Sequence, residues 1–176
     1  MLAAKQKQVK ERQQARLEKE ARQKQETLER LLEDLDEPEN HDFAIYRLNQ
    51  LGEVAIKPLI ETLLQDDDPD ARYGSARALG QICHEQAIKV LIKARAAKAL
   101  MQALKDSEPA VRYWSAEALG KFTGQTAENA IDPLIPLLKD SHKGVAAQAR
   151  RSLVAIGGPR AEEALEKSKR FFNWLK

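Results

Sequence analysis

The chain has 176 residues, of which 32% are charged and 5% aromatic, with only 8 glycines and 7 prolines. This composition is typical of a helix-rich soluble protein with one compact domain, or with one domain and an appendage. The net charge of +2 is too small to predict a nucleic-acid partner by itself.

Residues 1–36 are predicted to form a charged helical extension. Their first 25 residues are mostly Lys, Arg, Gln, Glu and Ala, which favour helix, and carry eight positive charges against three acids. Leu28, Leu31, Leu32 and Leu35 follow with helical spacing. We expect these last turns to dock on the body while the basic start projects, either as a solvated helix or as an arm that contacts a partner or an anionic surface.

From residue 37 onward the chain repeats itself. The clearest copies are ARYGSARALG at 71–80 and VRYWSAEALG at 111–120, which share seven of ten residues. Three copies carry an acid followed by proline, a pair that suits the start of a helix: Glu37-Pro38, Asp68-Pro69 and Glu108-Pro109. A fourth copy begins at Asp140, with Ser141 as the expected capping residue.

Each copy contains a first helix with a repeated apolar pattern and a second helix after it. Ala76, Leu79 and Ile82 of one copy correspond to Ala116, Leu119 and Phe122 of the next. Such helix pairs bury their apolar faces only by stacking. The sequence therefore predicts an all-α fold, a short right-handed α-solenoid of about four helix pairs with a long charged N-terminal helix. The expected domains are 1–36 and 37–176, with repeats at 37–66, 67–105, 106–139 and 140–176.

The segments DPDARYGSARALGQI and EPAVRYWSAEALGKF resemble the short HEAT-like repeat of the phycobilisome lyases (bilin lyases of the E/F type), which attach or detach bilins on phycobiliproteins. The resemblance covers residues 37–157 and weakens in the outer copies, where Asn40-His41 and Val145-Ala146 replace Val-Arg. It implies a fold of HEAT-like pairs, and a phycobiliprotein or photosynthetic complex component as partner, peripheral to a thylakoid or phycobilisome. A HEAT-like iron hydroxylase is excluded, because only His84-Glu85 matches its His-Glu pairs.

Candidate partner-binding residues occupy positions of the first helices that the core leaves free, and the resemblance implies that this face is concave. They are Phe43, Tyr46, Tyr73, Arg77, Tyr113, Trp114, Glu117, Lys121 and Arg151. Five of the nine aromatic residues are in this set, and Tyr, Trp and Arg are enriched at binding hot spots. Packing between repeats is the alternative interpretation. Gly74 occupies the position in its repeat that Trp114 occupies in the next repeat, and it is expected to leave a hollow for a partner side chain.

Other conspicuous residues favour structural roles. Arg72 and Arg112 are expected to bond acids or helix ends between repeats. Cys83 is expected to be a small, partly buried residue. Because it is the single cysteine of the sequence, no internal disulfide bond can form. The acidic run 66–70 indicates a solvated helix-opening turn, with a weak cation site as the alternative. No catalytic set, metal site or phosphate loop is visible, so no cofactor is expected unless the chain is lyase-like and takes a bilin.

The main functional prediction is a non-catalytic protein–protein interaction scaffold or adaptor, used in phycobilisome or photosynthetic complex assembly or turnover. One alternative is a phycobilin lyase or lyase subunit. Another is nucleic-acid or ribosome binding through the basic N-terminal helix. The C-terminal KSKRFFNWLK is expected either to seal the solenoid or to contact a membrane surface or partner. Without a signal peptide, a transit peptide or an apolar run of roughly 18 residues, we expect a cytoplasmic protein.

Overall fold

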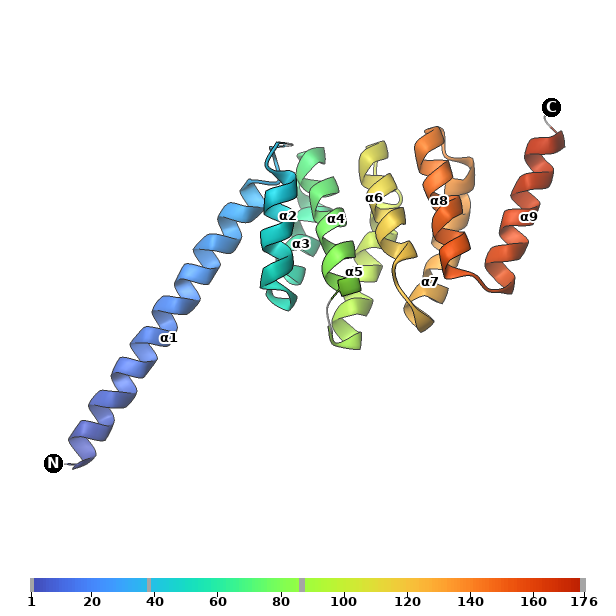
Figure 1. The fold of residues 1–176 in the computed structure, drawn as a ribbon. Helices are drawn as coiled ribbons and strands as arrows, with labels where there is room; N and C mark the ends of the chain where they lie inside the picture. The colour runs from blue at the N-terminus through green and yellow to red at the C-terminus, as the bar shows by residue number, and fades with distance from the viewer. Residues whose placement is uncertain (1, 38, 86–87, 175–176) are drawn as a thin grey trace.

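The computed structural model describes residues 2–37, 39–85 and 88–174, and within these ranges it contains helices and no strand. The helices in chain order are α1 (Leu2–Glu33), α2 (His41–Leu51), α3 (Glu53–Gln65), α4 (Pro69–Glu85), α5 (Val90–Ala103), α6 (Pro109–Gly120), α7 (Gly124–Leu134), the 3-10 helix η1 (Ile135–Lys139), α8 (Lys143–Ile156) and α9 (Pro159–Trp174). Consecutive helices form four pairs that stack side by side (Figure 1). The prediction of an all-α repeat solenoid is confirmed.

The long helix α1 projects from one end of the stack (Figure 1). Residues 6–27 are exposed, whereas Leu28, Leu31 and Leu35 are buried in the same core as the repeats. This is the expected arrangement, with a docked end and a projecting basic start. A polar helix of this kind gains little from burial, so Leu28 and Leu31, together with Leu35 in the turn after the helix, anchor it.

The first helices of the pairs, α2, α4, α6 and α8, are called the A helices, and α3, α5 and α7 are called the B helices. Each A helix contacts the next A helix, and each B helix contacts the next B helix. The core contains the predicted triads Ala76, Leu79 and Ile82, and Ala116, Leu119 and Phe122. The repeated apolar pattern therefore forms the contact between successive pairs.

The shared Ala-Leu-Gly segments end in a glycine because the A helices approach closely there. A Cβ atom placed on Gly80 would lie 2.6 Å from the Cβ of Ala118 in α6, and one placed on Gly120 would lie 2.8 Å from the hydroxyl of Ser152 in α8. Ser152 in turn donates a hydrogen bond to the carbonyl of Ala116 at 2.7 Å. A side chain at either glycine would separate the helices.

The helix starts agree in part with the acid-proline pattern. α4 and α6 begin at Pro69 and Pro109 as predicted. α2 instead begins at His41, so the prediction from Glu37-Pro38 was wrong in position, and Pro38 lies outside the described residues. Capping by Ser141 was also wrong, because α8 begins at Lys143 and the carboxylate of Asp140 accepts the His142 N–H instead, at 2.8 Å.

Two arginine clasps join the successive pairs and confirm the structural role predicted for Arg72 and Arg112. Arg72 donates from Nε and Nη2 to both carboxylate oxygens of Asp106, at 2.9 and 3.0 Å. Arg112 makes the same paired bonds to Asp140, at 2.8 and 2.9 Å. Each arginine also bonds two carbonyls of the turn before its own helix, at Asp66 and Asp67 or at Asp106 and Ser107. Each clasp therefore fixes two consecutive turns at once.

The first A helix carries half of this clasp. His41 stands in the arginine position, is buried, and bonds the carbonyl of Leu35 through its Nε2. That carbonyl lies six residues before His41, as the Asp66 carbonyl lies six residues before Arg72. His41 therefore fixes its own turn, and its ring meets that of Tyr73 in α4 edge to face, with centroids 4.5 Å apart.

Candidate functional site

The predicted partner-binding residues lie on consecutive A helices. Phe43 and Tyr46 come from α2, Tyr73 and Arg77 from α4, Tyr113, Trp114 and Glu117 from α6, Lys121 from the position directly after α6, and Arg151 from α8. These nine residues are called the A-helix strip. Helical spacing places them beside the buried stripe, so the stacking of the A helices brings side chains from four repeats together.

A continuous chain of contacts runs along the strip. Arg77 pairs with Asp42 of α2 at 2.6 Å, and its guanidinium lies 4.9 Å from the ring centroid of Trp114. The Trp114 and Tyr113 rings meet edge to face, with centroids 5.3 Å apart. Arg151 donates to the Tyr113 hydroxyl at 3.3 Å. Arg77 and Arg151 therefore connect α6 to the A helices on either side of it.

The strip contains both exposed and packed rings. Phe43 and Tyr46 are each 59% exposed. Tyr73, Tyr113 and Trp114 are half-buried against the hydrophobic core. The packing interpretation therefore holds for the rings of α4 and α6, whereas those of α2 face solvent, and partner binding stays a prediction.

The predicted hollow at Gly74 is absent, and that expectation was wrong. Gly74 is buried, and a Cβ placed on it would lie 3.0 Å from Cδ2 of Leu35. A gap between α4 and α6, lined by Arg77, Trp114 and Lys121 among others, holds only about 10 Å³. This gap is too small for a ligand molecule.

The remaining candidates have structural surroundings. In the acidic turn, the Asp66 carboxylate accepts the Asp68 N–H, and the Asp68 carboxylate accepts the Asp70 N–H. No group of His, Cys, Asp or Glu that could hold a metal ion occurs among the described residues. Cys83 is buried, and burial raises the pKa of its thiol to about 11. The side chains of Arg170 to Lys176 lie outside the described residues, so the predicted role of the C-terminal aromatic segment stays a prediction.

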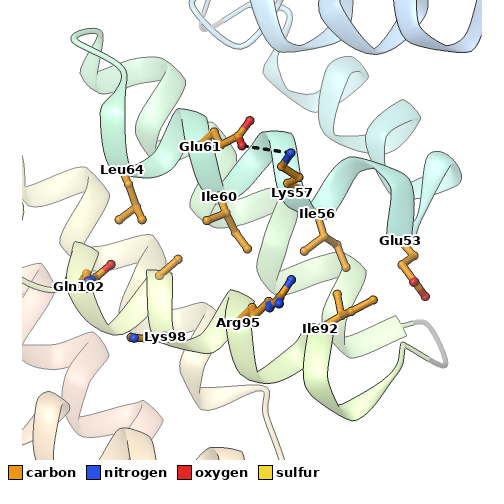
Figure 2. Close-up of a pocket in the computed structure, with 11 residues that line it drawn as sticks. Glu53, Ile56, Lys57, Ile60, Glu61, Leu64, Ile92, Arg95, Lys98 and Gln102 are labelled. Atoms are coloured by element: carbon orange, nitrogen blue, oxygen red, sulfur yellow. Dashed lines mark ion pairs between the residues drawn. The ribbon is translucent and has the colours of Figure 1, made fainter.

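The sequence analysis missed a groove between the B helices α3 and α5. It holds about 530 Å³ and is lined by Glu53, Ile56, Lys57, Ile60, Glu61, Leu64, Ile92, Arg95, Lys98, Ala99 and Gln102. Figure 2 shows Ile56, Ile60 and Leu64 pointing from α3 toward α5, with Ile92 pointing back from α5. The available signals were the four-residue spacing of the three α3 residues and the lack of acids from Lys89 to Lys105.

The family model described as HEAT repeats matches residues 25–99 and 97–169. The chain is similar in fold to a chain from the complex of CpcE and CpcF of phycocyanin lyase from Nostoc sp. PCC7120, with a TM-score of 0.65 and 23% identity over 80% of this chain and 85% of that one. It is also similar to a designed armadillo repeat protein in complex with the peptide (KR)4, with a TM-score of 0.55 and 19% identity over 79% of this chain and 69% of that one.

A comparison with curated protein sequences finds no match. None of the helices in the described ranges has both the length and the apolar character that crossing a bilayer requires. The repeat match extends over most of the chain, including the docked end of α1 and all four helix pairs. The chain belongs to the HEAT repeat family.

Proposed function

We propose that this protein is a non-catalytic scaffold that binds a partner protein on the A-helix strip. The observation that carries the proposal is the line of contacts over four consecutive A helices, which runs from Asp42 through Arg77, Trp114 and Tyr113 to Arg151. Arg77 contacts the half-buried ring of Trp114 and Arg151 that of Tyr113, while Phe43 and Tyr46 offer exposed apolar area on α2. A preorganised surface of this kind loses little side-chain entropy on binding.

The partner that we propose is a phycobiliprotein or another component of a photosynthetic complex, met in the cytoplasm or at a thylakoid. Support comes from the HEAT-like segments around Arg72 and Arg112 and from the fold similarity to a phycocyanin lyase chain. A strip whose gap holds only about 10 Å³ suits a folded protein better than a free pigment.

The test measures binding of purified phycocyanin by calorimetry. Because Tyr73, Tyr113 and Trp114 are half-buried, the informative variant is the double change Phe43→Ala and Tyr46→Ala, which removes exposed rings and spares the core. The matched control is Val54→Ala with Leu91→Ala, two apolar residues of α3 and α5 that are 64% and 68% exposed. We expect the first variant to weaken binding at least about tenfold and the control to leave it unchanged. Equal affinities for wild type and both variants would refute the strip as the binding surface.

A second candidate function is a bilin lyase subunit, favoured by the fold similarity to a lyase chain. Co-expression with a phycocyanin subunit and a bilin, followed by fluorescence of the denatured subunit on a gel, tests it. A covalent adduct above background would establish lyase activity. The same background with and without this chain would leave the scaffold proposal standing alone.

A further inference from the structure

We propose a second docking surface, distinct from the A-helix strip: the groove between α3 and α5 binds an acidic amphipathic helix of a partner protein. The groove belongs to the B helices, and none of its lining residues is part of the strip. The two surfaces can therefore be changed independently.

The floor of the groove is apolar and straight. Ile56, Ile60 and Leu64 follow one another at four-residue intervals along α3, Ile92 faces them from α5, and Ala99 of α5 also lines the groove. Leu64 remains 42% exposed, and Ile60 and Ile92 are half-buried. From Ile56 to Leu64 the floor extends over a little more than two helical turns, or roughly 12 Å at 1.5 Å per residue. This length matches side chains at positions i, i+4 and i+7 of one incoming helix.

The two walls differ in how their charges are satisfied. On α3, Lys57 pairs with Glu61 at 3.7 Å, and Glu53 pairs with Lys89 at 3.9 Å. On α5, Arg95 and Lys98 are exposed and make no ion pair with any residue that the structure describes (Figure 2). The sequence from Lys89 to Lys105 contains five cations and no acid. The unmatched charge of the groove is therefore positive, and an acidic partner complements it.

The backbone of the groove points to a helical occupant. Both walls are α-helices whose N–H and C=O groups bond within the helix, so they offer no edge on which an extended strand could pair. Recognition must then use side chains alone. An amphipathic helix presents leucine-like residues at the required spacing and carboxylates on the flank that faces Arg95 and Lys98.

The experiment uses the full chain and two labelled helical peptides of about 15 residues that share one leucine stripe. One peptide carries glutamate on its flanks, and the other carries lysine at the same positions. Binding is followed by fluorescence anisotropy, and methyl NMR maps the site. We expect the glutamate peptide to bind wild type at least about tenfold tighter than the lysine peptide and to shift the methyl signals of Ile56, Ile60, Leu64 and Ile92.

The decisive variant is Arg95→Glu with Lys98→Glu, which should reverse the preference between the two peptides. Its control, Lys19→Glu with Lys24→Glu on the exposed part of α1, makes the same charge change away from the groove and should leave the preference intact. Equal binding of the peptides, an unreversed preference, or shifts at the strip instead of the groove would overturn the proposal. So would self-association that Arg95→Glu with Lys98→Glu abolishes, because the occupant would then be a second copy of this chain.

Phe43→Ala with Tyr46→Ala should keep the glutamate peptide bound. The experiment therefore distinguishes a wrong assignment of the groove from a wrong assignment of the A-helix strip.

Discussion

Leu35 lies against Gly74, with its Cδ2 atom 3.0 Å from the place that a Cβ on Gly74 would occupy. This contact explains why two nearly identical ten-residue segments differ at that position. In the third copy Trp114 stands at the corresponding place and contacts Arg77. In the second copy the place is taken by the end of the N-terminal extension, so a side chain as large as tryptophan has no room there.

Replacing Gly74 with tryptophan should therefore displace the end of α1. We expect the free energy of unfolding to fall by about 1–3 kcal/mol, the usual cost of overpacking, and proteases to cut more readily near Leu31. Urea denaturation and limited proteolysis measure the two effects. Gly74→Ala is the control, because the end of one flexible leucine can shift for a methyl group. An unchanged Gly74→Trp variant would mean that Leu35 does not depend on this contact.

The Arg112–Asp140 clasp predicts a pH dependence of stability. The hydrogen bond from Arg112 holds the pKa of Asp140 below its usual range, so the folded state favours the carboxylate. The stabilisation is then complete above the unfolded-state value of about 4 and is lost as the pH falls through the lower folded-state pKa. Asp140→Asn should lower the free energy of unfolding by about 2 kcal/mol at pH 7. That difference should shrink below a pH of about 3, which denaturant titrations at several pH values would measure.

Asp67→Asn is the control for this prediction, because Asp67 is exposed and only its carbonyl takes part in a clasp. Its stability difference from wild type should be small and constant with pH. If Asp140→Asn gave the same flat profile, the clasp would not be the source of the pH dependence.

Cys83 should react slowly with thiol reagents in the folded protein. Burial both blocks access and raises the pKa of the thiol to about 11, so the thiolate that reacts is scarce at neutral pH. A colorimetric thiol assay should show rapid labelling in denaturant and slow labelling in buffer, with the native rate rising toward high pH. Equally fast labelling in both conditions would show that α4 opens near its C-terminal end.

Removing residues 1–24 should leave the stability of the repeats unchanged to within about 0.5 kcal/mol. The described side chains in this segment are exposed, and the anchoring leucines follow it. Leu31→Ala should instead cost about 2–4 kcal/mol because it creates a cavity. Thermal denaturation followed by circular dichroism compares the two. A large loss on truncation would mean that the projecting part of α1 contributes to the core.

The A-helix strip could be predicted from sequence because its members occupy equivalent positions in successive repeats. The 3.6-residue period of the helix then determines on which face their side chains lie. Arg72 and Arg112 were predictable for the same reason. The contact of Leu35 with Gly74 was not, because it depends on how the turn between α1 and α2 directs the chain. The same turn explains why α2 begins only at His41: the chain first returns to bury Leu35. The groove depends on the distance between α3 and α5, and no local sequence pattern determines that distance.

His41 occupies the position of the clasp arginine in the first A helix, so the first junction between helix pairs differs from the next two in how it resists force. Arg72 and Arg112 tie the last three helix pairs to one another, whereas the first pair is linked to the second by the Arg77–Asp42 ion pair, whose Asp42 side chain is exposed, and by the ring contact of His41 with Tyr73. An exposed ion pair contributes little to stability, so tension applied to α1 would first load the junction without a buried arginine clasp. The first pair would peel away while the remaining pairs stayed folded, as expected for a repeat protein whose stability is a sum over neighbouring interfaces. A load borne at the other end would meet the Arg112–Asp140 clasp before any other.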